Sequence, residues 1–280
     1  MKKVPPIILG LLFFANIAVW FAIFHTNAGV LRVSFLDVGQ GDAIFIEGPN
    51  GNQVLIDGGR DRSVTRALGD VMPFYDRSID VVIATHPDAD HIGGLPYVLE
   101  RFTVGAVIEN GTTAETGVYE GFARMRDESG AAIYTAVRGM VIDLGRGVYL
   151  RVLYPDGVVR GGEANDGSII TQLIYGETEV LLTGDASKRI EEYLVVLDKG
   201  ELASEVLKAG HHGSKTSSAA AFLAAVRPQY AVISAGADNQ YGHPHEEVTE
   251  RFDQMQVSII GTYDEGTITF VSDGETLRRK

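Results

Sequence analysis

The stretch "VVIATHPDADHIGGL", residues 81–95, places four side chains that can bind a metal directly after an apolar run. The run is typical of a buried strand and the residues after it are typical of a helix start, so the polar cluster should lie on a strand-to-helix loop. In an extended segment alternate side chains point the same way, which would put His86, Asp88 and Asp90 on one side and His91 on the other. One short loop could thus serve two metal positions.

Isolated Asp and His residues also follow three other apolar runs. Asp57 follows "VLI", Asp185 follows "VLLTG", and the pair His211 and His212 follows "VLKAG". Strand ends at one edge of a sheet can converge on one site. A lone Asp at a strand end is also typical of a turn or a helix cap, and Asp185 could cap the helix that begins in "ASKRIEEYL". The occurrence of four such features together favours a shared site.

The composition limits both the ligands and the partners. The chain has 280 residues and no cysteine, so a metal must be held by His, Asp, Glu or Asn side chains. The formal net charge of −13 would repel a phosphate backbone at long range, so a nucleic acid could be met only through a local basic patch or through the metal. Lys208, Lys215 and Arg60 lie close in sequence to the motif positions, where phosphates could be met.

The beginning of the chain is apolar. The run at residues 4–24 contains no charge and has about the length that spans a bilayer. Two lysines precede it, so the positive-inside rule leaves the N-terminus in the cytoplasm and the rest of the chain outside. We therefore predict an uncleaved membrane anchor at residues 1–30 and an extracytoplasmic domain at residues 31–280. A cleaved signal segment with a secreted product starting near Gly29 stays open, as does a buried core helix.

From residue 31 onward, short strands alternate with helical segments, and no linker, repeat or low-complexity tract interrupts them. The first three strands should form a meander, and the whole segment should form one α/β unit. The expected strands lie at 31–38, 43–48, 53–59, 80–85, 106–109, 132–137, 140–144, 148–154, 168–176, 179–185, 205–210, 230–236, 257–262 and 266–272. The expected helices lie at 63–72, 115–128, 187–198, 217–226 and 245–254, and one more begins in "GGLPYVLERF".

Several motifs together resemble one known family. "THPDADHIGGL" resembles the His-x-His-x-Asp-His signature of metallo-β-lactamase-fold hydrolases. With "FLDVGQGDA", "LIDGG", "LLTGD", "LKAGHHGSKTSS" and "NQYGHPH", it is similar to the extracytoplasmic C-terminal domain of the ComEC/Rec2 competence proteins, in the same order over residues 31–271. The resemblance implies a four-layer αββα sandwich with a dinuclear metal site at one edge of its two central sheets. It covers none of the polytopic channel of the full competence proteins.

The resemblance also implies which residues bind the metals. His86 and Asp88 would serve the first ion, and Asp185 would bridge it to the second. Asp57 would orient a ligand or a loop. The ligands implied for the second ion are Asp90, His91 and His212, with His211 facing the substrate. Which member of the adjacent histidine pair is the ligand stays open.

Two further loops match the family near the substrate. Asn239, Tyr241 and His243 lie in "NQYGHPH", where His243 could donate a proton to a leaving group or bind a phosphoryl oxygen. A role in the turn and in packing alone stays open for this loop. Asp37 and Asp42 lie in "DVGQGDA", which would shape the site or form a structural turn. The candidates for catalytic groups are His211, His243 and Asp90.

The sequence departs from the superfamily pattern at two places. The second His of the signature is Asp88 here, as in the competence relatives, and this hard oxygen ligand makes manganese more plausible than in an all-His zinc site. Where many members carry a His before the next strand, this chain has "EANDGSII", so Asn165 or Asp166 must substitute or that metal is held more loosely. The expected cofactors are two divalent metal ions, Mn or Zn.

The metal site indicates hydrolysis, since two divalent ions activate water and stabilise both the entering and the leaving oxygen at phosphorus. The resemblance implies a phosphodiesterase that acts on DNA outside the membrane, with single-stranded DNA or another phosphodiester as its partner. A hydrolase of a small ester, lactam or phosphoester has the same metal requirements and needs no basic groove. A non-catalytic surface binding protein is the third alternative. The sequence contains no serine-nucleophile elbow, Walker loop or dinucleotide fingerprint.

Overall fold

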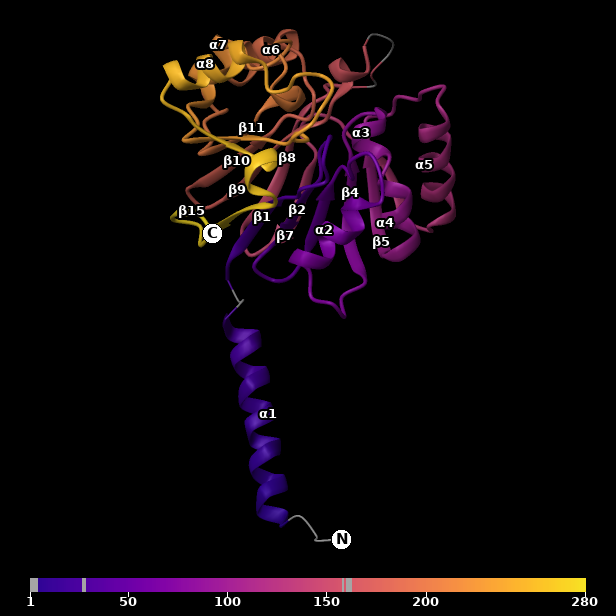
Figure 1. Ribbon diagram of the computed structural model, residues 1–280, viewed down its shortest axis with the longest axis vertical. Coiled ribbons are helices and arrows are strands. Elements are labelled where there is room, and N and C mark those ends of the chain that lie inside the picture. Colours follow the sequence, from indigo (N-terminus) through magenta and orange to yellow (C-terminus); the bar gives the residue numbers. More distant parts are fainter. Residues whose placement is uncertain (1–4, 27–28, 158, 160–162) are drawn as a thin grey trace.

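The computed structural model describes residues 5–26, 29–157, 159 and 163–280, and for Pro6 and residues 18–26 it describes the backbone alone. One helix protrudes from a globular α/β domain (Figure 1). Within this domain, two β-sheets face each other, and helices cover their outer faces. The protruding helix is α1, Pro6–Thr26.

The first sheet has eight strands in the order β15-β14-β1-β2-β3-β4-β5-β6. The strands β1, β2 and β3 pair antiparallel, which confirms the predicted meander. From β3 to β6 the pairs are parallel, because helical crossovers connect these strands. The strands are β1 Leu31–Phe35, β2 Ile44–Glu47, β3 Gln53–Ile56, β4 Ser78–Ala84, β5 Thr103–Glu109, β6 Ala132–Thr135, β14 Ile268–Ser272 and β15 Leu277–Arg279.

The second sheet has seven strands in the order β13-β12-β11-β10-β9-β8-β7. Hairpins join β7 to β10, so these pairs are antiparallel, whereas β10 to β13 are parallel and connected by helices. The strands are β7 Val141–Gly145, β8 Val148–Tyr154, β9 Ile170–Tyr175, β10 Thr178–Leu182, β11 Val206–Lys208, β12 Tyr230–Ile233 and β13 Ser258–Gly261.

Three buried apolar clusters separate four layers, which confirms the predicted αββα sandwich. The central cluster lies between the sheets and takes side chains from both, such as Phe35 and Val206. The second packs α2, α4 and α5 on the first sheet through Leu68 and Phe122, and the third packs α6, α7 and α8 on the second sheet through Phe222. The helices are α2 Ser63–Val71, α4 Leu95–Arg101, α5 Gly117–Glu128, α6 Lys188–Asp198, α7 Ala220–Val226 and α8 Glu246–Gln254.

Each strand and helix expected from residue 31 onward is present, with bounds that differ by a few residues. The sequence did not predict the short elements β15, α3 (Ala89–Ile92) and α9 (Thr262–Glu265), nor the 3₁₀ turns Ala164–Gly167 and Gly210–Gly213. Segments of three or four residues are too short to show a periodic pattern, which explains these omissions. Two of them, α3 and the turn at Gly210–Gly213, carry residues of the candidate site.

The direction of the strands decides where the candidate residues lie. The strands β1, β3 and β4 run the same way, because β1 and β3 both pair antiparallel with β2 and β4 pairs parallel with β3. At the carboxyl end of β4, the carbonyl of Thr85 accepts from the N–H of Ile169, which precedes β9 in the other sheet. The two sheets therefore join at this end, and α1 enters at the opposite end, before β1 (Figure 1).

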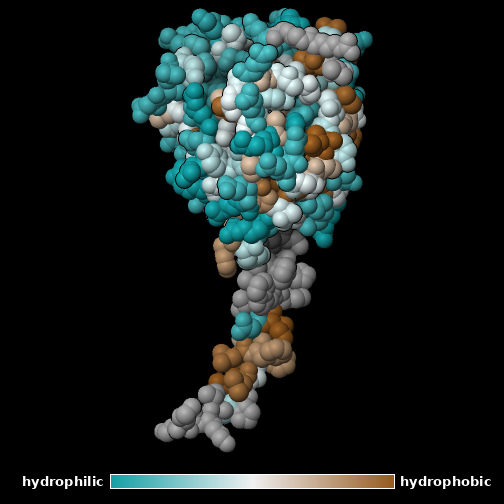
Figure 2. Space-filling model, turned by 90° about the vertical axis from the view of Figure 1, so that its right-hand side faces the viewer, coloured by the Kyte–Doolittle hydropathy of each residue, from teal (hydrophilic) through white to brown (hydrophobic). Residues whose placement is uncertain are grey.

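The helix α1 exposes apolar side chains along the part whose side chains are described, among them Ile7, Leu11 and Phe14 (Figure 2). Over the described residues, no helix has the length and apolarity needed to cross a membrane. The predicted anchor or signal segment, residues 1–30, falls partly outside the described residues, which omit 1–4, 27–28 and the side chains of 18–26.

Candidate metal centre

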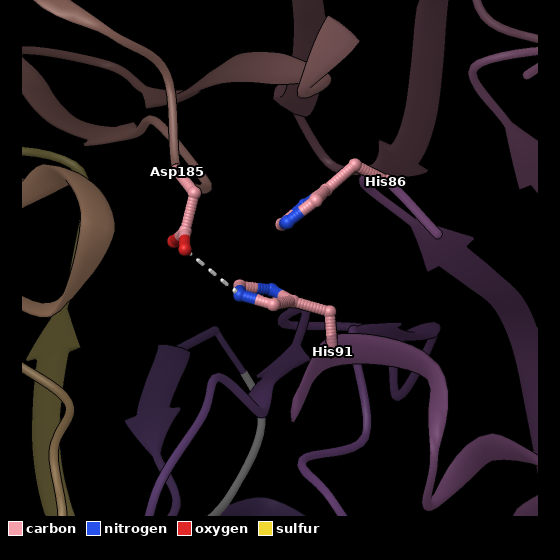
Figure 3. A group of neighbouring side chains, drawn as sticks. All are labelled: His86, His91 and Asp185. Carbon is pink, nitrogen blue, oxygen red and sulfur yellow. Dashed lines mark ion pairs between the residues drawn. The ribbon is translucent and has the colours of Figure 1, made fainter. Parts of the chain in front are cut away.

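His86, His91 and Asp185 point toward one another from three different elements (Figure 3). His86 follows β4, His91 lies in α3, and Asp185 follows β10. Nε2 of His91 lies 3.3 Å from Oδ2 of Asp185, and the ring centroids of the two histidines are 4.1 Å apart. All three side chains are buried, so strand ends of both sheets bring metal-binding atoms to one interior point.

The prediction that His91 faces away from the rest of its motif is wrong. It treated the motif as extended, whereas the helical turn α3 begins at Ala89, directly after the extended Asp88. The N–H of His91 donates to the carbonyl of Asp88 at 3.0 Å, and this turn brings the imidazole back beside His86. Oδ2 of Asp88 lies 3.6 Å from Nε2 of His86. The motif therefore surrounds one compact centre.

His212 reaches the same centre from the loop after β11. Its Nε2 lies 3.3 Å from Oδ2 of Asp185 and 3.4 Å from Oδ2 of Asp90. Both His211 and His212 have left-handed backbones, with φ of 49° and 56°, a conformation that costs about 1–3 kcal/mol for each residue. A hydrogen bond from the N–H of His211 to the carbonyl of Gly184, at 3.2 Å, helps to hold this turn. The turn aims the two adjacent rings in different directions, with an interplanar angle of 73°.

Asp57 and Thr85 orient two of the histidines. Nδ1 of His91 donates to Oδ2 of Asp57 at 2.8 Å. The Thr85 hydroxyl donates to the same oxygen at 2.7 Å, so the hydroxyl oxygen accepts from Nδ1 of His86 at 3.0 Å. With Nδ1 occupied as a donor, Nε2 of each ring is the atom that faces the centre and can take a proton or a metal.

The imidazole nitrogens that face the centre fit a metal. Nδ1 of His212 donates to the carbonyl of Ser234 at 2.8 Å, which again leaves Nε2 for the centre. In the described part of the chain, Nε2 of His86, His91 and His212 is buried and not aligned for a hydrogen bond. An unpaired buried polar group costs about 1–3 kcal/mol, and imidazole with carboxylate is a usual ligand set for divalent metals. Among the described residues the donor atoms form four overlapping groups, and two of them involve the predicted ligands alone: His86 with His91 and Asp185, and Asp90 with His91 and His212.

Lys208 lies inside the site. It is fully buried, and its Nζ donates to the carbonyl of Gly184 at 2.9 Å, pairs with Asp42, and lies 3.4 Å from Oδ1 of Asp185. Burial disfavours the ammonium form, but Asp42 and Asp185 raise the pKa of Lys208 above its usual value. The sequence-based suggestion that Lys208 meets a phosphate is therefore wrong, because its ammonium is enclosed among carboxylates.

Asp42 reaches the interior because its loop packs closely on the metal-binding motif. Its Oδ1 lies 3.4 Å from Nδ1 of His212, and its N–H donates to the carbonyl of Asp90 at 3.2 Å. A Cβ on Gly41 would lie 1.9 Å from that carbonyl oxygen, so only glycine permits this approach. The loop "DVGQGDA" thus shapes the site, one of the two alternatives that the sequence left open.

The carboxylates and imidazoles of the site shift one another's pKa. Burial opposes the imidazolium form, but Asp185 and Asp57 hold the pKa of His91 well above its usual value, and Asp185 is the main cause of a similar rise for His212. Burial alone would raise the pKa of Asp185, but His212 and His91 hold it well below its usual value. The site therefore attracts positive charge, either as protons on the histidines or as metal cations.

His211 differs from His212 in its environment. Its Nδ1 lies 3.3 Å from Nδ2 of Asn165, an amide nitrogen that can only donate, so Nδ1 accepts and Nε2 carries the proton. That Nε2 lies 3.7 Å from Oδ2 of Asp185. The side chain of His211 is 27% exposed, whereas that of His212 is 1% exposed. His212 thus has the surroundings of a metal ligand, whereas His211 is partly exposed and its Nε2–H lies beside the carboxylate of Asp185.

The predicted substrate loop lies beside these histidines. Nδ2 of Asn239 donates to the carbonyl of His243 at 2.6 Å, and Oδ1 of Asn239 accepts from the N–H of His243 at 2.9 Å. The half-exposed ring of Tyr241 stacks on His243, and the His243 ring lies 5.6 Å from that of His211. Burial, together with His212 and His211, lowers the pKa of His243 to about 4. His243 is therefore neutral at pH 7.

Three other predicted positions make different contacts. Asp37 accepts from the N–H of Gly39 at 3.1 Å, as in a structural turn. Asp166 binds the Ser187 hydroxyl and pairs with Arg189 at 2.6 Å, so Asn165 is the member of the "AND" segment that contacts a site histidine. Lys215 has an exposed side chain.

A cavity of about 300 Å³ opens beside Asp88. It is lined by Pro87, Thr112, Thr113 and Glu163, among others. Small-molecule sites usually have volumes of about 300–1,000 Å³, so this cavity is at the small end of that range.

Sequence reasoning did not foresee the buried role of Lys208 or the bridging hydroxyl of Thr85. A signal for Lys208 was present, because this lysine stands within the apolar strand "EVLKAG", and a lysine is rarely fully buried unless it is paired. For Thr85 we find no comparable signal, since a threonine at a strand end is common.

Comparison with known proteins agrees with this fold. The family model described as "Metallo-beta-lactamase superfamily" matches residues 36–237. The chain is 31% identical over 257 residues to ComE operon protein 3 of Bacillus subtilis (strain 168), and the alignment covers 85% of this chain and 33% of that protein. It is 32% identical over 242 residues to Competence protein ComA of Neisseria gonorrhoeae, covering 85% and 32%. The chain thus spans about a third of the length of these curated relatives.

A solved structure extends the comparison. CmlA, a diiron beta-hydroxylase from Streptomyces venezuelae, superimposes with a TM-score of 0.53 at 14% sequence identity, over 82% of this chain and 52% of that chain. At this identity the likeness concerns the fold alone. The region that the family model matches contains His86, His91, Asp185 and His212, which converge at the sheet edge. The chain therefore belongs to the metallo-beta-lactamase superfamily.

Proposed function

We propose that this chain is a dinuclear metal-dependent phosphodiesterase that acts on DNA outside the membrane. The observation that carries the proposal is the arrangement of three buried imidazoles, those of His86, His91 and His212, whose Nε2 atoms surround the carboxylate of Asp185. Similarity to a competence protein of Neisseria gonorrhoeae supports a nucleic-acid substrate.

Two overlapping groups of donor atoms support two metal positions. His86 and Asp88 would hold the first ion, and Asp185, whose Oδ2 faces His91 and His212, would be shared with the second. The ligands of the second ion would be Asp90, His91 and His212. Asp57 would keep the ring of His91 in place through its hydrogen bond to Nδ1.

The net charge of the site also supports two divalent metal ions. Among the described residues, five carboxylates gather here, and the ammonium of Lys208 compensates one of them. With neutral histidines, the remaining charge equals that of two divalent cations. The carboxylates are those of Asp42, Asp57, Asp88, Asp90 and Asp185. A set this rich in oxygen suits Mn²⁺ at least as well as Zn²⁺.

The residues around the centre would have different roles in hydrolysis. Divalent cations held there would supply Lewis-acid chemistry, with activation of water and stabilisation of charge on the phosphoryl oxygens. Burial lowers the pKa of His211, so its ring is neutral at pH 7, and its Nε2–H beside Asp185 would hold a phosphoryl oxygen by a hydrogen bond. His243 is neutral at pH 7, so it would orient the substrate by a hydrogen bond and would not act as an acid. Burial opposes ionisation of Asp90, but His212 lowers the pKa of its carboxyl, which suits a metal ligand.

A second candidate function is hydrolysis of a small ester, lactam or phosphoester. The cavity of about 300 Å³ beside Asp88 has room for a small molecule, and the net charge of −13 disfavours a long polyanion. DNA would instead have to be bound through the metals and the exposed cations Lys215 and Arg60.

We propose that the N-terminal segment anchors the chain in the membrane and that the catalytic domain lies outside it. Support comes from the uncharged run at residues 4–24 and from the exposure of Ile7 and Phe14 on α1. Full-length chain should fractionate with membranes, and residues 31–280 should be accessible to protease added to spheroplasts. Recovery of a mature protein that begins near Gly29 would show a cleaved signal instead.

The function is tested on protein purified without a chelator. We expect two divalent ions per chain, and Mn²⁺-supported cleavage of single-stranded DNA and of a generic phosphodiester. Asp185→Asn keeps the shape of the side chain but removes the bridging charge, so it should lose metal and activity, while Asp253→Asn on the exposed face of α8 should change neither. Cleavage of small esters without cleavage of DNA would favour the second candidate. If Asp185→Asn loses metal but the parent protein hydrolyses none of these substrates, the chain would be a non-catalytic binding protein.

A further inference from the structure

The turn before β4 carries two aromatic side chains that pack against little of the protein. Phe74 is 84% exposed and Tyr75 is 62% exposed. Their rings contact each other edge to face, with centroids 5.4 Å apart. Burying an aromatic side chain stabilises a protein by roughly 1.5–3 kcal/mol, so two neighbouring exposed rings forgo a substantial gain in the isolated chain.

The turn holds these rings rigidly. The N–H of Asp76 donates to the carbonyl of Pro73 at 2.9 Å, which closes the turn. Oδ1 of Asp76 accepts from the N–H and the hydroxyl of Ser78, at 3.0 and 2.9 Å, and Oδ2 accepts from Nε2 of Gln53 at 2.7 Å. The turn is thus bound to the neighbouring strand β3, so the outward position of the two rings is built into the fold.

The rings lie at the end of the domain that is opposite the metal centre. The strands β1 and β4 run the same way, and the centre lies at the carboxyl end of β4, so the turn before β4 lies at the end where β1 begins. Pairing aligns Val33 with Ile46, Ile46 with Val54, and Val54 with Val81 in one row across the sheet, and Asp80 directly precedes this row. The turn precedes Asp80 by several residues and therefore reaches beyond this row, toward the side from which α1 arrives (Figure 1).

The same end of the domain is tied to α1. The N–H of Gly29 donates to the carbonyl of Pro49 at 3.4 Å, and the carbonyl of Gly29 accepts from the Tyr175 hydroxyl at 3.2 Å. Only two residues separate Gly29 from Thr26, the last residue of α1, and a chain spans at most about 3.3–3.6 Å per residue. Across the sheet, three strand spacings of about 4.8 Å separate β1 from β4. Along the strand direction, the aromatic turn therefore lies at the same end of the domain as the end of α1. Across the sheet, it lies about three strand spacings from β1.

We propose that Phe74 and Tyr75 insert into the headgroup region of the bilayer to which the proposed N-terminal anchor attaches the chain, as a second membrane contact of the domain. This inference rests on the proposed membrane anchor. Aromatic rings prefer the interface between hydrocarbon and water, where the ring is desolvated and the tyrosine hydroxyl stays hydrated. Charges of both signs are exposed around the turn, Arg77 within it and Asp70 and Asp80 on the flanking elements, so the apolar contribution to the contact comes from the two rings.

The second contact would fix the orientation of the domain. A single tethered helix leaves a domain free to tilt, whereas a rigid second contact at about three strand spacings from the first opposes tilting. Because the metal centre lies at the opposite end of β4, it would then face away from the bilayer. Such an orientation leaves the centre open to a substrate that arrives from outside.

The test uses the full chain in phosphatidylcholine vesicles with lipids brominated on their acyl chains, which quench tryptophan at short range. The chain has one tryptophan, Trp20 in the apolar run, so the parent protein reports on α1. Phe74→Trp in a Trp20→Phe background reports on the turn, and Val118→Trp in the same background is the control. Val118 is exposed at the start of α5, which follows the carboxyl end of β5 and lies near the metal-centre end.

We expect the tryptophan at position 74 to emit at shorter wavelength in vesicles and to lose much of its emission to bromine, while the one at position 118 stays unquenched at low and high salt. Quenching of Trp20 without quenching at position 74 would overturn the membrane contact of the turn. Absence of quenching at Trp20 would show that the anchor itself is wrong, which is a distinguishable failure. The double change Phe74→Ser and Tyr75→Ser should leave the melting temperature unchanged, because neither ring is packed in the fold.

Discussion

Nζ of Lys208 lies 3.4 Å from Oδ1 of Asp185. This is the carboxylate oxygen that does not face His91 and His212. The other oxygen, Oδ2, lies 3.3 Å from Nε2 of both His91 and His212. The lysine therefore contacts one oxygen of the carboxylate, and the two histidines lie beside the other. It also compensates part of the negative charge that five carboxylates bring to a buried centre.

Replacement of Lys208 should destabilise the protein. Lys208→Met leaves the buried carboxylate of Asp42 without its cation, and breaking a buried pair from one side costs about 3–5 kcal/mol. The double change Lys208→Met and Asp42→Asn should recover part of this loss, since the carboxylate that pairs most closely with Lys208 is then neutral. Urea unfolding with chelator present measures both variants. Equal stability of Lys208→Met and the parent would refute the buried pair.

Asp57→Asn tests the hydrogen bond that orients His91. Asn fits the left-handed backbone at this position, where φ is 59°, so the fold should persist. The amide is a weaker acceptor for Nδ1 than a carboxylate, and loss of such a partner typically lowers metal affinity about 10–100-fold. Calorimetric titration with Mn²⁺ gives the affinity. An unchanged affinity would mean that Asp57 serves only the fold.

The stability of the metal-free protein should fall as pH rises above neutrality. The carboxylates hold the pKa of His91 and His212 well above the usual value of 6.5, so the protonated histidines stabilise the fold fully below about pH 6.5. This contribution is lost as pH rises through the raised pKa values. Melting temperatures measured with chelator across this range check the direction.

Bound metal should oppose the loss of stability that the metal-free protein shows as pH rises. A cation competes with the protons on His91 and His212, so its affinity should rise over the same pH range in which the metal-free protein loses stability. Melting temperatures with saturating Mn²⁺ should therefore exceed those with chelator by a margin that grows with pH. A constant margin would show that neither histidine binds the metal.

His243→Ala should leave the metal content unchanged and reduce substrate binding. Since the pKa of His243 is lowered to about 4, the ring carries no acidic proton at pH 7, and one lost hydrogen bond should raise KM about tenfold or less. Steady-state kinetics at pH 7 separates KM from kcat. A fall in kcat of about 10²–10⁴-fold would instead identify His243 as a general acid.

Local patterns in the sequence were sufficient for the strands, the helices and the motifs, and the family resemblance carried by those motifs implied the four layers. Apolar runs marked the strands, and helical periodicity marked α2, α5 and α6 close to their observed bounds. The motif at residues 85–95 and the strand-end residues Asp57 and Asp185 were found in advance, since strand ends at one edge of a sheet converge by topology. The metal identity, the substrate and the membrane anchor stay predictions.

The tertiary structure alone decided how individual side chains are used. The short turn α3 returned His91 to the side of His86, the contact with Asn165 distinguished His211 from His212, and contacts with two carboxylates enclosed Lys208. These outcomes depend on partners that are distant along the chain, such as Asp42 for Lys208, and no local pattern encodes such a partner. The sequence by itself determined the motif and the strand-end residues Asp57 and Asp185, and the family resemblance supplied the rest of the implied ligand set. Only packing between the two sheets determined which atoms face it, because burial leaves each polar group the few partners that lie within hydrogen-bond distance.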